Sequence, residues 1–175
     1  MHQVELSDVP MHSALRPLLE GADFCDSYRF PLSDPHMPAL GIILAVMGES
    51  PAWIDGLMWI RNKTVRMVGL KDLGALGAFD PLKPASAYRS GDRVGIFSVQ
   101  ENRESEAIVG DKDKHLDVWL SVCKLPPDGN GHWAVLTTVV KTKNTLGRFY
   151  MRVVKPFHRL IAPTSLKAYV ARSVG

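Results

Sequence analysis

The chain has 175 residues, of which 46% are hydrophobic and 22% are charged, and its formal net charge is +3. This balance is typical of a soluble globular domain, and one domain of this length can bury about 70% of its unfolded surface. The basic residues are scattered, with their densest run between Lys141 and Arg159. They lack the clustering and the exposed aromatic partners of a nucleic-acid-binding face. Composition therefore predicts a single domain over residues 1–175 that does not bind nucleic acid.

The cysteines and the N-terminus indicate the cellular compartment. Cys25 and Cys123 are far apart in the sequence and form neither a disulfide framework nor a metal-ligand spacing. The first residues are polar and acidic, unlike a signal peptide. The most apolar run, residues 40–48, has about half the length of a membrane span. We expect a cytoplasmic protein with reduced thiols and no membrane insertion.

The N-terminal part predicts an extension and one strand. Residues 1–20 form the extension, with a short helix around Ser13–Leu19. A strand follows over Ala22–Leu32, because aromatic side chains recur there at every second position. One face of this strand carries Phe24, Asp26, Tyr28 and Phe30.

Two helices and a long connection come next. Pro38–Gly48 is a compact apolar helix that Gly48 ends. A second helix starts at Ser50, which can serve as its N-cap, and Pro51 suits its first turn. Residues 69–91 have no lasting period, and we expect a long loop or lid there.

The second half of the chain predicts four antiparallel strands and a closing helix. The strands cover residues 91–102, 104–110, 114–125 and 132–142, with turns at 110–113 and 126–131. A long amphipathic helix then begins at Thr145 or Leu146. One face of this helix carries residues that recur at helical spacing, namely Phe149, Val153, Phe157, Leu160 and Thr164. Pro156 and Pro163 are expected to kink or restart it.

The order of these elements resembles that of the helix-grip, START-like (SRPBCC) superfamily. At the level of motifs the chain is similar to domain-of-unknown-function family 2867. The motifs, in chain order, are ADFCDSYRF, WIRN, GDRVGIFSV, GDKDKHLDVWLSV, TTVV followed by NTLGRFY, and VKPFHRLI. The resemblance implies an α+β fold in which a curved antiparallel sheet wraps around the C-terminal helix, with two shorter helices after the first strand. Members of the wider superfamily bind apolar molecules in a cavity between sheet and helix, and some are cyclases or hydrolases.

His115 and Asp117 are the best candidates for catalysis. Alternate residues of a strand point to the same side, so a carboxylate there could orient an imidazole for general-base work. The alternative is that both lie on a solvated face, with Leu116, Val118, Leu120 and Val122 turned toward the core. Trp119 shares the His115 face and is costly to expose, so both faces can be covered. His158 is too poorly spaced to complete a metal site, and we expect no metal and no cofactor.

Several residues are candidates for ligand binding. Trp53, Trp119 and Phe149 could line an apolar pocket, or they could be ordinary core residues. Asn144 and Arg148, where the last strand joins the helix, could hold an anionic head group. His158 lies between basic residues and is a candidate for the edge of the cavity.

These observations lead to three functional hypotheses. The first is a binding protein for a small apolar or amphipathic molecule, held between the sheet and the C-terminal helix. The second is a cyclase- or hydrolase-like enzyme that uses His115 and Asp117 in the same cavity. The third is a structural or interaction module that could form a homodimer and whose cavity is filled by its own side chains.

Overall fold

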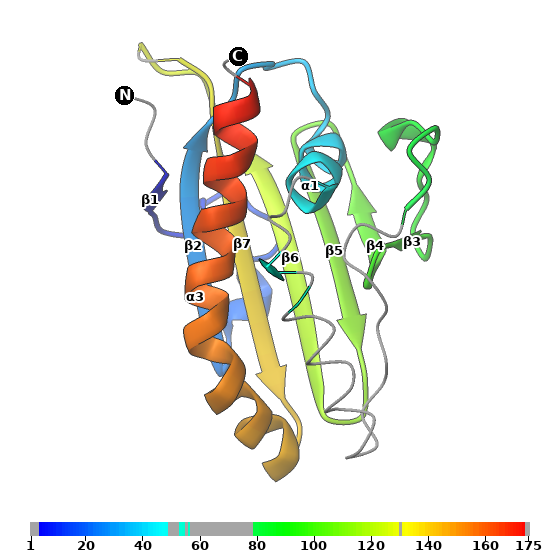
Figure 1. The fold of residues 1–175 in the computed structure, drawn as a ribbon, viewed down its shortest axis with the longest axis vertical. Coiled ribbons are helices and arrows are strands. Elements are labelled where there is room, and N and C mark those ends of the chain that lie inside the picture. The colour runs from blue at the N-terminus through cyan, green and yellow to red at the C-terminus, as the bar shows by residue number, and fades with distance from the viewer. Residues whose placement is uncertain (1–3, 49–52, 55, 57–78, 130, 174–175) are drawn as a thin grey trace.

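The computed structural model describes residues 4–48, 53–54, 56, 79–129 and 131–173. One antiparallel sheet of seven strands runs in the order β1-β2-β7-β6-β5-β4-β3 (Figure 1). The strands are β1 (Glu5–Leu6), β2 (Phe24–Pro31), β3 (Arg93–Val94), β4 (Phe97–Asn102), β5 (Glu106–Lys112), β6 (Leu116–Lys124) and β7 (Trp133–Thr142). The first and last long strands, β2 and β7, are therefore neighbours, although more than a hundred residues separate them.

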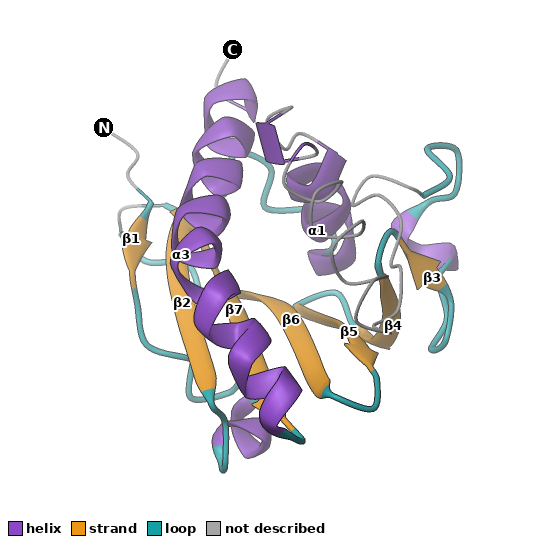
Figure 2. Ribbon diagram, turned by 60° about the horizontal axis from the view of Figure 1, so that its bottom comes forward, coloured by secondary structure: helices purple, strands orange, loops and turns teal. Residues whose placement is uncertain are grey.

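Two α-helices lie on the same side of this sheet. They are α1 (Ala39–Gly48) and α3 (Thr145–Ser173), and Figure 2 shows both above one face of the strands. Helix α3 contacts β2 and β7, whereas α1 contacts β5 and β6. The curved antiparallel sheet and the long C-terminal helix confirm the predicted α+β class and are consistent with a helix-grip fold.

Parts of the prediction between the two helices fall outside the described residues. The second helix, predicted from Ser50, lies largely there, as do residues 69–78 of the predicted lid. The remaining part of the lid contains a short 3-10 helix, η2 (Ala85–Ala87). Its preceding loop is held by an ion pair between Lys83 and Asp92 at 2.7 Å.

The predicted strand over residues 91–102 was wrong in one respect, because the structure contains two strands there. The chain reverses at Gly95, so that β3 pairs antiparallel with β4 and Val94 lies opposite Phe97. Gly95 has a φ of 56°, which glycine adopts without steric cost. The strand β5 also extends to Lys112, two residues beyond the Gly110 where a turn was expected.

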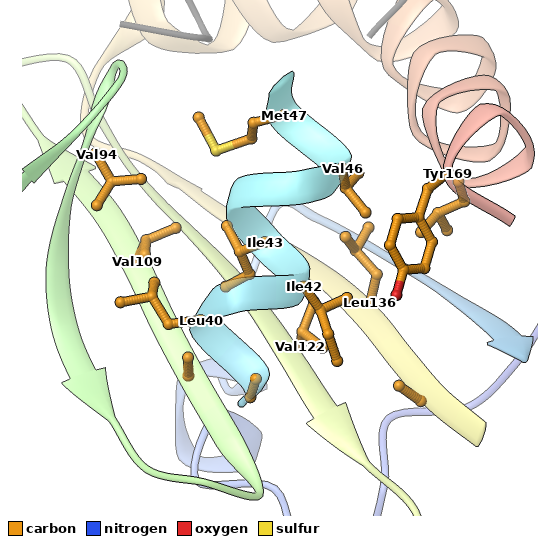
Figure 3. Packing of buried hydrophobic residues seen from close by; sticks show 14 of the residues in the cluster. Leu40, Ile42, Ile43, Val46, Met47, Val94, Val109, Val122, Leu136 and Tyr169 are labelled. Carbon is orange, nitrogen blue, oxygen red and sulfur yellow. The ribbon is translucent and has the colours of Figure 1, made fainter. Parts of the chain in front are cut away.

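The concave side of the sheet packs against α1. Leu40, Ile42 and Ile43 of this helix are fully buried, and they contact the inward face of the sheet, which includes Val109 and Val122 (Figure 3). Apolar side chains recur around most of α1, as is typical of a helix covered on several sides. This packing places α1 over β5 and β6, where it also contacts α3.

The convex side of the sheet is covered by the N-terminal segment, which includes the 3-10 helix η1 (Arg16–Leu19). Leu15 is fully buried there against Ile108, Trp119 and Val139. Glu106 fastens the segment, because its buried carboxylate accepts hydrogen bonds from the Ser13 hydroxyl, the Ala14 amide and the Ser121 hydroxyl. These bonds measure 2.5, 2.8 and 2.8 Å.

Helix α3 begins at Thr145, as predicted. Asn144 caps it, since its Oδ1 accepts the Gly147 amide at 3.0 Å and so satisfies one of the free donors of the first turn. The helix continues through Pro156 and Pro163 as one element to Ser173. Its buried residues are Gly147, Met151, Ala162, Ser165, Leu166, Tyr169 and Val170.

Candidate ligand-binding cavity

A cavity of about 220 Å³ lies between α1, α3 and the concave face of the sheet. Its floor is made by alternate side chains of the two central strands: Leu116, Val118 and Leu120 of β6, and Leu136, Thr138 and Val140 of β7. Alternation places these residues on one face because successive side chains of a strand point to opposite sides. Of the two faces predicted for β6, the one that carries leucine and valine is therefore turned inward.

The roof of the cavity comes from the helices. Val46 and Met47 of α1 stand on one side, and α3 contributes Met151, His158 and Ser165 on the other. Ile54, which is fully buried, closes part of the space between them. Most of the lining is apolar, so a molecule held there would be recognised mainly by burial of apolar surface.

Thr138 supplies an unpartnered polar group in this apolar surface. Its side chain is on the cavity floor, the residue is only 2% exposed, and its Oγ1 has no hydrogen-bond partner among the described residues. A buried hydroxyl without a partner costs about 1–3 kcal/mol. Because Thr138 belongs to the cavity lining, a bound molecule with one hydrogen-bonding group suits this position.

A histidine and a carboxylate lie beside Thr138. Asp26 of β2 is directly opposite Thr138 in the register of β2 and β7, so both side chains are on the concave face. Nδ1 of His158, from α3, lies 3.1 Å from Asp26 Oδ2, and the Asp26 side chain is 6% exposed. The ring of His158 also packs edge-on against Phe24, with 5.4 Å between the ring centres. These contacts hold the imidazole at the cavity wall.

Tyr28 is the next inward residue along β2. Burial, followed by the negative charge of Asp26, raises the pKa of its hydroxyl. Tyr28 therefore stays a neutral hydrogen-bonding group at physiological pH. The four residues that the sequence placed on one face of this strand are all buried, and Asp26 is the charged one among them.

The structure does not bring His115 and Asp117 together as a catalytic pair. The carboxylate of Asp117 forms an ion pair with Lys143 at 2.6 Å, and Nδ1 of His115 accepts a hydrogen bond from Nδ2 of Asn144 at 3.0 Å. Neither residue lines the cavity. The reason is geometric, because the inward face of β6 belongs to Leu116 and its alternate neighbours.

The predicted aromatic lining lies elsewhere. Trp119 is buried on the convex face against Leu15, and Trp53 is 41% exposed while its neighbour Ile54 reaches the cavity. Phe149 is 65% exposed on the outside of α3. From this part of the helix it is Met151 that faces the cavity. None of the three aromatic residues lines the cavity, whereas His158 does.

The two residues predicted to hold an anionic head group, Asn144 and Arg148, both form hydrogen bonds within the protein. Asn144 caps α3 and donates a hydrogen bond to the Lys114 carbonyl at 3.0 Å. Arg148 is exposed and donates to the Thr145 hydroxyl at 3.3 Å. The sequence reasoning overlooked Thr138 and Asp26, although a carboxylate on the otherwise aromatic face of β2 was a usable signal.

In the described part of the chain, no three His, Cys, Asp or Glu side chains gather into a group that could hold a metal ion. Neither of the helices described has the length and apolar character needed to cross a membrane.

Comparison with known proteins assigns a family. The chain belongs to the family described as protein of unknown function (DUF2867), whose model matches residues 18–165. This match spans β2 to most of α3 and so includes the residues of the cavity floor and Asp26. No curated protein and no solved structure matches the chain.

Proposed function

We propose that the protein binds a small, largely apolar molecule with one hydrogen-bonding group in the cavity between α1, α3 and the sheet. The observation that carries this proposal is an apolar cavity of about 220 Å³ whose floor contains Thr138, a buried residue whose hydroxyl has no hydrogen-bond partner in the described part of the chain. An apolar body would fill the space, and one polar group would satisfy Thr138.

The volume limits the size of the ligand. A cavity of about 150 Å³ accommodates benzene, and pockets for drug-sized molecules begin at about 300 Å³. The volume of this cavity, about 220 Å³, lies between these two values. The expected ligand is therefore a single substituted ring or a short branched chain, smaller than the lipids bound in the superfamily that the chain resembles.

Two probes of equal size test this proposal. Phenol and toluene have the same number of non-hydrogen atoms, but only phenol can hydrogen-bond. We expect phenol to bind several-fold more tightly in isothermal titration calorimetry, because a satisfied hydrogen bond contributes about 1 kcal/mol. Ala162→Leu, which places extra carbons in the cavity wall, should weaken both probes. Native mass spectrometry of freshly purified protein would in addition reveal a retained cellular ligand.

A negative result with both probes would contradict the proposal. If neither probe binds, and the freshly purified protein carries no additional mass, the cavity is not a ligand site of this kind. The interaction module with a filled cavity would then be the better hypothesis.

A second candidate function is an enzyme that uses the same cavity. It is favoured by the contact between His158 and Asp26, because a carboxylate that holds one ring nitrogen can prepare the other for proton transfer. His158 and Asp26 thus replace His115 and Asp117 as the residues to test. Turnover of a small ester such as 4-nitrophenyl acetate should fall in His158→Ala, with His36→Ala as an exposed-histidine control. Equal rates in both variants would remove this candidate.

A further inference from the structure

The outer face of α3 carries a row of exposed apolar side chains. Phe149, Val153, Phe157 and Leu160 are 65%, 51%, 46% and 56% exposed. Their spacing places them on adjacent turns of one side of the helix. They make up half of the large apolar side chains that are exposed among the described residues. We call these four residues the outer stripe.

A row of cations runs beside the outer stripe. Arg148, Arg152, Lys155 and Arg159 follow one another at intervals of four, three and four residues, which keeps them on one side of a helix. The three arginines are exposed. Throughout Thr145–Ser173 the sequence contains six Lys or Arg residues and no Asp or Glu. The outer face of α3 is therefore both apolar and positively charged.

The apolar and cationic character of this face indicates which kind of partner could cover the outer stripe. A second copy of the chain, docked through the same face, would bring two cationic rows together, and like charges in contact oppose association. An anionic lipid surface complements both features, since basic residues meet the head groups while aromatic and aliphatic side chains enter the boundary with the acyl chains. We propose that the outer face of α3 docks on anionic membrane surfaces, with the helix lying in the plane of the interface.

The inner side of the same helix faces the cavity. Met151, His158, Ala162 and Ser165 line it, on the side of α3 opposite the outer stripe. Docking would therefore bring the cavity wall to the membrane without unfolding the sheet. The proposal rests on the exposed stripe and the cations alone, and it stands whether or not the cavity holds a ligand.

Co-sedimentation with lipid vesicles tests the proposal on the full chain. We expect binding to vesicles of equal parts phosphatidylserine and phosphatidylcholine, weak or no binding to phosphatidylcholine alone, and release by salt. Arg148→Gln combined with Arg152→Gln should weaken binding about thirtyfold, because each basic residue near an anionic surface contributes about 1 kcal/mol. Arg89→Gln combined with Arg103→Gln removes the same charge from exposed positions near the opposite edge of the sheet and should bind like the wild type.

The apolar contribution is tested separately. Phe149→Ser combined with Phe157→Ser should weaken binding about thirtyfold or more, since burying each ring is worth at least about 1 kcal/mol. Leu82→Ser, at a residue that is 89% exposed outside α3, is the matched control. Circular dichroism would verify that every variant is folded. No binding to anionic vesicles, equal binding to neutral ones, or a solution dimer that the Phe149 and Phe157 substitutions dissociate would each overturn the proposal.

Discussion

Thr138→Val tests the unpartnered hydroxyl at the centre of the proposed site. Valine has nearly the same shape as threonine and suits a strand equally well, so the substitution changes little besides the Oγ1 atom. That atom is buried, belongs to a residue of the cavity floor, and has no hydrogen-bond partner among the residues that the structure describes. Its replacement should therefore stabilise the ligand-free protein.

The magnitude follows from the cost of an unsatisfied buried polar group, about 1–3 kcal/mol. For a chain of this length, each kcal/mol shifts the melting temperature by about 2–4 °C. We expect Thr138→Val to raise the melting temperature by a few degrees. It should also abolish the preference for phenol over toluene, because the hydrogen-bonding partner of phenol is gone.

The preceding residue provides a matched control. Thr137 is 1% exposed, but it faces the other side of the sheet, where its Oγ1 lies 3.0 Å from the Ser27 hydroxyl. Thr137→Val removes this hydrogen bond, so it should destabilise the protein by about 1 kcal/mol. The two neighbouring substitutions, identical in chemistry, are thus expected to have opposite signs.

The assay is thermal and urea unfolding of both variants without ligand, followed by titration with phenol and toluene. If Thr138→Val destabilises the protein as much as Thr137→Val, then the Thr138 hydroxyl already has a partner. The argument that the cavity floor needs a polar group from a ligand would then be refuted.

Three further predictions concern local features of the chain. A Cβ added at Gly147 would lie 2.2 Å from the His115 carbonyl oxygen, so Gly147→Ala should lower the urea midpoint despite the better helix propensity of alanine; an unchanged midpoint would contradict this. Burial, followed by the charge of Glu106, raises the pKa of the Cys123 thiol to about 12, so a thiol reagent at neutral pH should label the exposed Cys25 first and Cys123 only after unfolding. Labelling of both at equal rates would show that the convex face opens. The Thr142 amide donates a hydrogen bond of 2.6 Å to the Asp23 carboxylate and is the main cause that lowers the pKa of Asp23. This carboxylate therefore stabilises the fold above its unfolded pKa, and the stabilisation is lost as the pH falls through the lowered folded pKa. Asp23→Asn should flatten the acid side of a plot of melting temperature against pH, and an unaltered plot would refute the reasoning.

The sequence was sufficient to predict the fold class because its local patterns agree with the architecture. Alternation over residues 115–123 indicated the strand β6, and the β-branched residues over 133–142 indicated the strand β7. The start of α3 was also predicted, at Thr145 or Leu146, whereas the role of Asn144 as its N-cap is seen only in the structure. The separate strand β3 was missed because its reversal depends on a single residue, Gly95.

The candidate site was harder to predict because its residues come from distant parts of the chain. Asp26 and His158 are 132 positions apart, and only the pairing of β2 with β7 and the return of α3 bring them together. His115 and Asp117 were conspicuous because they are close in sequence. Their actual partners, Asn144 and Lys143, come from the turn before α3, and no local spacing specifies such contacts.

Helix α3 shows why periodicity alone could not identify its buried side. Apolar residues occur on two faces, the outer stripe and the face that includes Met151, Leu166 and Tyr169. The inner face also contains the small residues Ala162 and Ser165, which let a helix approach a sheet closely, whereas the rings of Phe149 and Phe157 would hold it away. Two faces of α3 are therefore apolar in sequence, and the small residues on one of them favour its packing on the sheet. The side chains of the outer stripe are left on the surface together with the arginines, which is an arrangement that suits an anionic membrane interface.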